Sequence, residues 1–280
     1  MKPLFSRDYV AMALSGDYRM GRREVGIRRM HVVIEKMTIV GYLFLYPLAK
    51  LPIVGGLWEM ICRSWGQNVF GFFIRSAYWK TKLKEMGTNV FFDYGVHIWA
   101  PRNVKIGSDV HIDHGVIIWG TDGFVKIGSR INIGCYSLIQ GRGGVIIEDD
   151  CGISPHVAIY SSTHYQWFPD GRRMAASPMG REEQYILAKP VVIRHHSYIK
   201  YGSLVTHGQE GIVIGPYGFI LPNSLVKDDV APETMAGGNP AKYMRDWGER
   251  RNVARKSDNQ LMSDGNDPHK RDDAICSIGT

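Results

Sequence analysis

Aliphatic residues recur six positions apart over most of the chain between residues 106 and 226. They form five triplets: Ile106, Ile112 and Ile118; Ile127, Ile133 and Ile139; Ile147, Ile153 and Ile159; Ile193, Ile199 and Val205; and Ile214, Ile220 and Val226. Side chains return to one face of a helix about every 3.6 residues and to one face of a strand every 2, so neither element alone gives this period. A short strand followed by a tight turn does give it, and three such units close a coil of about 18 residues.

The triplets predict how these coils pack. Stacking places each aliphatic side chain above its counterpart, while backbone hydrogen bonds join one coil to the next. Burying fifteen such side chains at about 1.5–3 kcal/mol each gives roughly 20–45 kcal/mol, an upper bound before chain entropy is subtracted. We therefore predict an all-β solenoid, a triangular parallel β-helix, with Val90 and Val96 adding a partial earlier coil. An ordinary β-sandwich is the alternative, but it does not explain five triplets in register.

One interruption in the repeat predicts a long loop. Successive triplets begin 21 and then 20 residues apart, but the fourth, at Ile193, begins 46 residues after the third. That is 28 residues more than a coil of about 18 requires, and the excess follows Ile159. We expect a loop over residues 160–190 that projects from the prism, with complete coils on both sides. His164 lies near its start.

Two segments resemble a known family. LVKDDVAPETMAGGNPAKYMR (Leu225–Arg245) resembles the closing segment of the hexapeptide-repeat acyltransferases. ISPHVAIYSSTHYQW (Ile153–Trp167) resembles the stretch that holds the loop histidine in the maltose and galactoside O-acetyltransferase branch. The similarity covers residues 89–248. It implies a left-handed β-helix, a homotrimer, acetyl-CoA as co-substrate and a hydroxyl acceptor, with the donor in a groove between adjacent subunits.

The resemblance also implies roles for single residues. His164 takes the place of the family's catalytic histidine. The residues implied at the donor are Gly202 and Ser203 beside the pantetheine arm, Asn223 and Ser224 in the matching turn of the next coil, and Lys227, Lys242 and Arg245 near the nucleotide phosphates. Lys200 and Tyr201 stand where the family has glycines, which alters the backbone approach to the donor. Gly134 stands where the sugar-binding asparagine of the galactoside branch would fall, which argues against a simple maltose or galactoside acceptor.

The chemistry requires a proton acceptor. Acetyl transfer to a hydroxyl needs a base that works near pH 7 and donors for the oxyanion. Histidine, with an unperturbed pKa of about 6.5, suits this task and contributes roughly 10²–10⁴ in rate. We therefore predict His164 as general base, against the alternative of a loop histidine without function; Asp170 is only a weak candidate for its partner. His207 is the second candidate, with a structural or substrate-facing role expected.

Four further histidines, His97, His111, His114 and His156, raise the possibility of a metal site. Left-handed β-helix trimers include a zinc-dependent carbonic anhydrase class whose three histidine ligands are shared between subunits and spread over successive coils. Here His111 and His114 lie on one short strand and turn, whereas zinc needs ligands that converge on one point. We therefore expect no metal.

The segment Met37–Cys62 is apolar over 26 residues but contains Lys50 and Glu59. Helix up to Pro47 would be about 14 Å long, half of a hydrocarbon core of about 30 Å. Pro47 and Pro52 bracket Lys50, and a charge at mid-membrane costs roughly 2.5–3.5 kcal/mol. We predict a broken or interfacial element in peripheral or monotopic attachment. A true span and a helical cap over the first coil are the alternatives.

Basic residues concentrate in the N-terminal third. The whole chain has a net charge of +7, and residues 1–90 contain 14 Lys/Arg against 6 Asp/Glu. Residues 1–36 carry 8 Lys/Arg and residues 63–84 carry 5, so both flanks of the apolar segment favour the cytoplasmic side. An anionic membrane surface is therefore the expected partner, and no signature of a nucleic-acid module is present.

The remaining features predict location and domain limits. The four cysteines show no CxxC or framework spacing, and Arg7 and Asp8 interrupt any signal-peptide core, so we expect a reduced, cytoplasmic protein at the inner face of the membrane. The predicted regions are a basic segment (1–36), a membrane-associating or capping helical region (37–88), a β-helix acyltransferase domain (89–248) and a polar disordered tail (249–280).

Together these observations give three functional hypotheses. The first is an acetyl-CoA-dependent O-acetyltransferase acting on a sugar hydroxyl of a bacterial surface polysaccharide intermediate, with a lipid-linked glycan as acceptor. The second is an O-acetyltransferase of a soluble sugar, a nucleotide sugar or a small molecule. The third is a non-catalytic β-helix scaffold or binding module, which predicts no binding of CoA.

Overall fold

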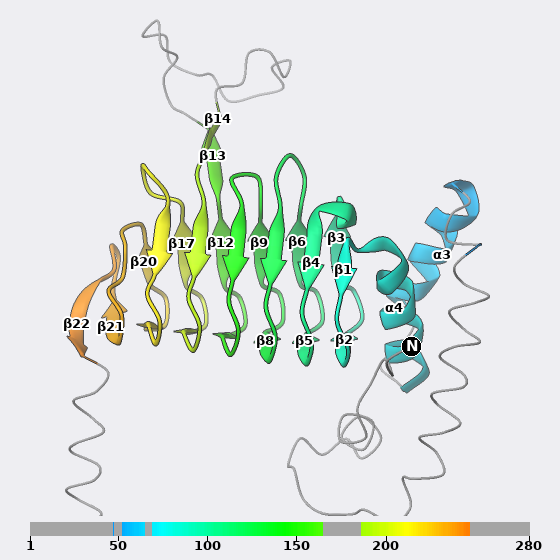
Figure 1. The fold of residues 1–280 in the computed structure, drawn as a ribbon, viewed down its shortest axis with the longest axis horizontal. Helices are drawn as coiled ribbons and strands as arrows, with labels where there is room; N and C mark the ends of the chain where they lie inside the picture. Colours follow the sequence, from blue (N-terminus) through cyan, green and yellow to red (C-terminus); the bar gives the residue numbers. More distant parts are fainter. Residues whose placement is uncertain (1–46, 48–51, 65–68, 165–185, 247–280) are drawn as a thin grey trace, which may run out of the picture.

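The computed structural model describes residues 47, 52–64, 69–164 and 186–246. They form a parallel β-solenoid whose coils lie side by side along the long axis of the molecule (Figure 1). Helices α3 (Pro52–Ser64) and α4 (Val69–Lys82) lie at one end, and the antiparallel pair β21 (Thr234–Gly237) and β22 (Lys242–Asp246) lies at the other. The prediction of a parallel β-solenoid from the six-residue period is confirmed.

Three sheets form the faces of the solenoid. Sheet A contains β1 (Glu85–Met86), β4 (Val104–Ile106, preceded by the 3-10 turn η1, Pro101–Asn103), β7 (Val125–Ile127), β10 (Val145–Ile147), β15 (Val191–Ile193) and β18 (Ile212–Ile214). Sheet B contains β2 (Val90–Phe92), β5 (Val110–Ile112), β8 (Ile131–Ile133), β11 (Gly152–Ile153), β16 (Tyr198–Ile199) and β19 (Phe219–Ile220), followed by β21 and β22. Sheet C contains β3 (His97–Trp99), β6 (Ile117–Trp119), β9 (Leu138–Gln140), β12 (Ala158–Tyr160), β17 (Leu204–Thr206) and β20 (Leu225–Val226).

The strand register reproduces the sequence repeat. On sheet A, Ile106 pairs with Ile127, which pairs with Ile147. Ile147 pairs in turn with Ile193, although 46 residues separate them in the chain. The first and third residues of each three-residue strand in sheet A point inward from β4 onward, so the strand period of two operates inside the six-residue period.

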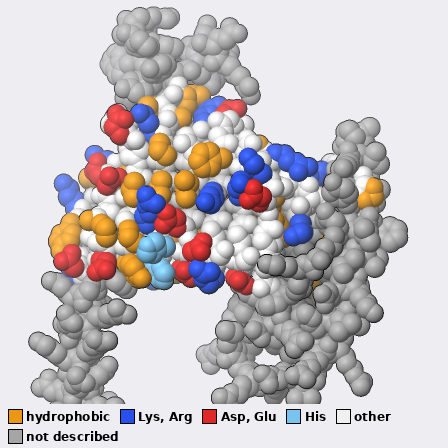
Figure 2. All heavy atoms as spheres, in the orientation of Figure 1, with side chains coloured by type: hydrophobic (Ala, Val, Ile, Leu, Met, Phe, Trp, Pro, Cys, Tyr) orange, Lys and Arg blue, Asp and Glu red, His pale blue; other side chains and the backbone are white. Residues whose placement is uncertain are grey.

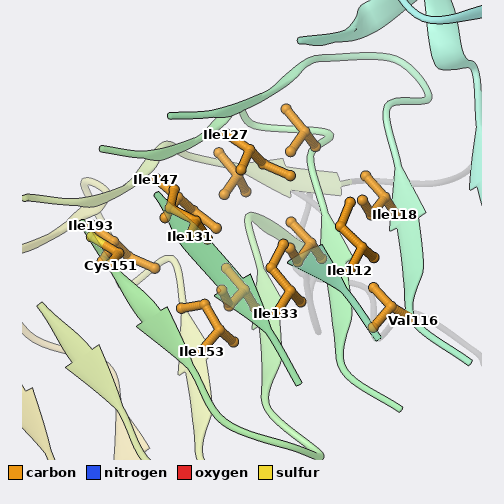
Figure 3. Packing of buried hydrophobic residues seen from close by; sticks show 14 of the residues in the cluster. Ile112, Val116, Ile118, Ile127, Ile131, Ile133, Ile147, Cys151, Ile153 and Ile193 are labelled. Carbon is orange, nitrogen blue, oxygen red and sulfur yellow. The ribbon is translucent and has the colours of Figure 1, made fainter. Parts of the chain in front are cut away.

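The predicted aliphatic residues form the core. None of the fifteen side chains is more than 3% exposed. Figure 3 shows Ile112, Ile133 and Ile153 following one another along the inside of sheet B. Valine and isoleucine side chains that precede them in the strands, such as Val110 and Val145, are equally buried. The core is therefore a set of aliphatic columns, each built from one residue per coil.

Polar side chains form a second ladder at the turns between sheets A and B. The Arg130 guanidinium donates to both carboxylate oxygens of Asp150, at 2.6 and 2.7 Å, and the His196 ring stacks on Tyr217. Arg194 pairs with Glu148 at 2.6 Å. On the face shown in Figure 2, acidic and basic side chains are likewise interspersed. Neighbouring coils are thus joined by pairs of opposite charge as well as by apolar packing.

The predicted loop leaves the solenoid as a hairpin. After β12 the chain forms β13 (Ser162–His164), which pairs antiparallel with β14 (Ile186–Ala188). Residues 165–185, the rest of the predicted loop, lie outside the described residues. Strands β12 and β17 still pair directly, so the coils continue on both sides of the hairpin.

Helix α4 caps the first coil. The Arg75 Nε–H donates to the Phe92 carbonyl, and the Ser76 hydroxyl donates to the Val90 carbonyl, both at 2.8 Å. Tyr78 and Trp79 are buried against the same end of the core. The edge strand of a solenoid exposes carbonyls that would otherwise lack donors, so this helix covers the open end.

A helical cap over the first coil is the alternative that the sequence gives for Met37–Cys62, and the helix that covers the coil is α4, which follows that segment. Among the described residues, no helix is both long enough and apolar enough to cross a membrane. Of the segment 37–62, on which the predicted membrane attachment rests, residues 37–46 and 48–51 lie outside the described residues, as do residues 1–36 and the tail 249–280.

Adjacent positions on β10 test the inward and outward alternation. We predict that Ile147→Ala lowers the free energy of unfolding by about 2–5 kcal/mol, because the removed side chain is 1% exposed and leaves a cavity. Its neighbour Ile146 points outward, so Ile146→Ala is the matched control and should cost under about 1 kcal/mol. Urea unfolding curves of both variants make the comparison, and equal losses would contradict the register.

Candidate active site

A cavity of about 950 Å³ lies against the outer face of sheet C. Its lining comes from three parts of the chain. Sheet C contributes Trp119, Gln140, Tyr160, Leu204 and Thr206; the hairpin contributes Ser162, Thr163, His164 and Ile186; and the turns beyond contribute Arg142, residues 207–211 and residues 227–229. The described ends of the insertion that interrupts the repeat thus form one wall of this cavity.

Strand β13 brings His164 to this cavity. Its residue partner in the hairpin is Ile186, and its side chain is exposed. The base of the hairpin is tied to the solenoid, because the Gln140 side chain donates to the Ser162 hydroxyl at 2.5 Å and the Ser161 hydroxyl donates to the Gln140 carbonyl at 2.6 Å. The hydrogen bonds to Gln140 in the preceding coil therefore fix the base of the hairpin that carries His164.

His207 lines the same cavity and is only 5% exposed. Its Nδ1 lies 2.5 Å from the Gly208 carbonyl oxygen. A carbonyl can only accept, so Nδ1 carries the proton in this contact and Nε2 of a neutral ring keeps a free lone pair. In the neutral form of this second histidine candidate, Nε2 is therefore the nitrogen that can accept a proton.

The two ends of the cavity differ in charge. Beyond sheet C, Lys227 lies among Glu210, Asp228 and Asp229. Of these carboxylates, Glu210 pairs with Lys189 at 3.0 Å and Asp229 accepts from a backbone N–H at 2.7 Å. This acidic end is the one nearest the last coils.

The opposite end combines one cation with an aromatic pair. Arg142 pairs with Asp122 at 2.5 Å through Nη2. Trp119 packs on Trp99 with ring centroids 4.6 Å apart. The Trp119 Nε1–H is buried and has no acceptor among the described residues, and such a donor costs about 1–3 kcal/mol when left unpaired. None of these residues was singled out from the sequence.

The donor residues implied by the resemblance do not all meet in one place. Lys227 lines the cavity together with His164. The others lie elsewhere on the single chain: Gly202, Ser203, Asn223 and Ser224 at the turns between sheets B and C, and Lys242 and Arg245 on β22. The donor groove between subunits, in which these residues would take part, stays a prediction.

The turns between sheets B and C have a structural role of their own. The Ser203 and Ser224 hydroxyls are buried, and both donate to the Leu221 carbonyl, at 2.9 and 2.7 Å. Gly202 has a φ of 69°, and a methyl group on it would overlap the Asn223 side-chain oxygen. The backbone here is therefore held by the Ser203 bond, which joins neighbouring coils, and by the Ser224 bond, which lies within one turn.

Two of the noted departures from the family pattern acquire a structural account. A side chain at Gly134 would overlap the backbone nitrogen of Pro155 in the next coil, so there is no room for an asparagine at that position. Tyr201 is exposed, and the Lys200 ammonium lies 4.8 Å from the centroid of the Tyr198 ring. Gly134 and the pair Lys200 and Tyr201 all lie at the turns between sheets B and C, and none of them lines the cavity.

Two of the four histidines considered for zinc lie close to an aspartate. His111 lies 3.5 Å from Asp113, and His114 lies 3.8 Å from Asp93. Burial raises the pKa of Asp113, an effect that His111 opposes. Within the ranges that the structure describes, no three His, Cys, Asp or Glu side chains converge as metal ligands.

Comparison with known proteins places this architecture. No protein-family model matches the chain. The dTDP-4-amino-4,6-dideoxy-D-glucose acyltransferase of Escherichia coli is 33% identical over 163 residues, which cover 57% of this chain and 80% of that protein. The chain belongs to the hexapeptide-repeat acyltransferase superfamily, as the closing segment of the repeat predicted.

The fold agrees with that of a solved structure. AntD, an N-acyltransferase from Bacillus cereus crystallised with dTDP and 3-hydroxybutyryl-CoA, aligns with a TM-score of 0.53 and 23% identity over 64% of this chain and 94% of AntD. A galactoside acetyltransferase in complex with coenzyme A aligns with a TM-score of 0.47 and 18% identity over 73% of this chain and 84% of that one. The second likeness is too low to assign the chain to the galactoside branch.

A substitution at Gly202 tests the backbone role of this turn. We predict that Gly202→Ala lowers the free energy of unfolding by about 1–2 kcal/mol, because alanine is strained at this positive φ. Gly56→Ala is the control, since a methyl group there has no neighbour within 4 Å and a helical alanine is favoured over glycine. Thermal unfolding measures both. An unchanged stability for Gly202→Ala would contradict the structural role.

Proposed function

We propose that this protein is an acyl-CoA-dependent acyltransferase whose acceptor is a nucleotide-linked sugar. The observation that carries the proposal is the 33% identity to the Escherichia coli enzyme, whose name gives a dTDP-amino sugar as its substrate. The cavity supports it, because two histidines, His164 and His207, face one recess large enough for a small-molecule substrate.

The proposed reaction uses these histidines for proton transfer. A hydroxyl or amino group of the sugar attacks the thioester carbonyl, and the carbon–sulfur bond breaks as the new bond to oxygen or nitrogen forms. His164 accepts the proton of the nucleophile and returns it to the departing CoA thiolate. A neutral ring at His207, with Nδ1 bound to the Gly208 carbonyl, offers Nε2 as a second acceptor.

This proposal changes the order of the hypotheses drawn from the sequence. The nucleotide-sugar acceptor, there an alternative, is now preferred to the lipid-linked glycan. The lipid-linked acceptor rested on the apolar segment 37–62 and on the missing asparagine at Gly134, and no further observation on the described residues favours it. Acetyl as the acyl group, a hydroxyl as the nucleophile, a left-handed coil and attachment to the inner membrane surface remain finer proposals, each implied by the resemblance or by the N-terminal sequence.

Substitution of the histidines tests the mechanism. We predict that His164→Ala lowers kcat by about 10²–10⁴-fold with an unchanged Kd for CoA, since a general base contributes that factor. His207→Ala is assayed beside it, and His196→Ala, which removes a histidine outside the cavity, is the control. Release of free thiol from acetyl-CoA with a dTDP-amino sugar is the readout.

The outcomes distinguish the candidates. A loss confined to His207→Ala would move the base to that residue, and full activity in both variants would remove histidine from the mechanism. A wild-type protein that neither binds CoA nor transfers an acyl group would support the non-catalytic scaffold instead.

Assembly is a separate prediction. Because the donor groove of the family lies between subunits, we expect a homotrimer with three times the 31.6 kDa mass of the chain. Light scattering of the protein as it elutes from a size-exclusion column measures this mass directly. A monomer that retained full transferase activity would contradict a site shared between subunits.

A further inference from the structure

The cavity is ordered along the stack of coils, and this order suggests how an acceptor lies in it; the inference rests on the proposed function. Trp119 belongs to the second strand of sheet C and Tyr160 to the fourth, with Gln140 between them. Neighbouring strands lie about 4.8 Å apart, so the Trp119 and Tyr160 rows are separated by roughly 10 Å. His164 follows Tyr160 closely in the chain, and Lys227 lies beyond it.

The aromatic end offers a flat binding surface. Trp119 lines the cavity, while Trp99, which is 41% exposed, packs on it from the first coil. Planar heterocycles stack on indole rings, and nucleobases do so whatever their sequence context. The unpaired Trp119 Nε1–H adds a donor that a carbonyl of such a heterocycle could satisfy after a small movement of the ring.

The charge distribution assigns the anionic part of the ligand to the same end. Among the lining residues on this side of His164, Arg142 is the charged one, and it contacts Asp122 through Nη2 alone in the part of the chain described. Its remaining guanidinium N–H groups can bind phosphate oxygens. The three carboxylates of the cavity lie at the other end, where they would repel a diphosphate.

We propose that the nucleoside diphosphate of the acceptor binds at this end, with its base stacked on Trp119 and its diphosphate on Arg142. This arrangement directs the sugar towards His164, in the middle of the cavity. Trp99 acts as a positioning residue that supports the Trp119 ring.

CoA contains an adenine nucleotide, so the same chemistry could come from the donor. The test therefore uses two probes, dTDP and CoA, and measures their Kd for the full-length protein by calorimetry. Trp119→Leu removes the stacking surface, Trp119→Phe keeps a ring but removes the N–H donor, and Arg142→Gln removes the charge. Tyr217→Leu, at an exposed aromatic outside the cavity, is the matched control.

We expect Trp119→Leu and Arg142→Gln each to raise the Kd for dTDP by about tenfold or more, within the range of base stacking and charged hydrogen bonds. Trp119→Phe should give a smaller increase, and the Kd for CoA should stay the same in all variants. The control should bind both probes as the wild type does. Since Arg142 is partly exposed, its variant keeps the test valid if Trp119→Leu fails to fold.

Four results would overturn the inference, and they separate it from the proposed function. Unchanged dTDP binding in both variants would place the nucleotide elsewhere and leave the acyltransferase proposal standing. Weakened CoA binding with unchanged dTDP binding would assign this end to the donor. If the wild type bound CoA but not dTDP, the nucleotide subsite would be absent; if it bound neither, the proposed function would fall as well.

Discussion

The hydrogen bonding of each coil to the next is the constraint on which the rest of the structure depends. Bonds such as Gly107 N–H to Ile127 carbonyl, at 2.9 Å, and Gly128 N–H to Ile147 carbonyl, at 2.8 Å, repeat from coil to coil. They fix the register, and the register places one aliphatic side chain above another in the core. A stack of this kind has two open ends, and helix α4 covers the first by supplying donors from Arg75 and Ser76.

The same constraint explains how the hairpin can be inserted without loss of the fold. Strands β12 and β17 pair directly even though β13, β14 and the residues between them intervene in the chain. Each coil needs only its two neighbours, so an insertion at a corner costs the stack little. The base of the hairpin therefore has a fixed position along the stack of coils, and this position determines where His164 lies.

The fold was more predictable than the site. All fifteen aliphatic residues chosen from the period are buried, because inward positions must be apolar in every coil. The outward positions carry no such requirement, and Trp119, Gln140 and Arg142 show no pattern in the sequence. The resemblance led to His164 and Lys227, which do line one cavity. It also led to Ser203 and Ser224, but their hydroxyls both donate to the Leu221 carbonyl.

The sequence by itself therefore determined the period, the buried columns, the place of the insertion and the family. These are local or repeated properties, since each coil meets the same packing demand at the same positions. Only the tertiary structure decided which outward side chains gather around a cavity and that α4 closes the first coil. Stacking brings together residues some 20 positions apart, as with Trp99 and Trp119 or Asp122 and Arg142, and the linear order of the chain does not record that proximity.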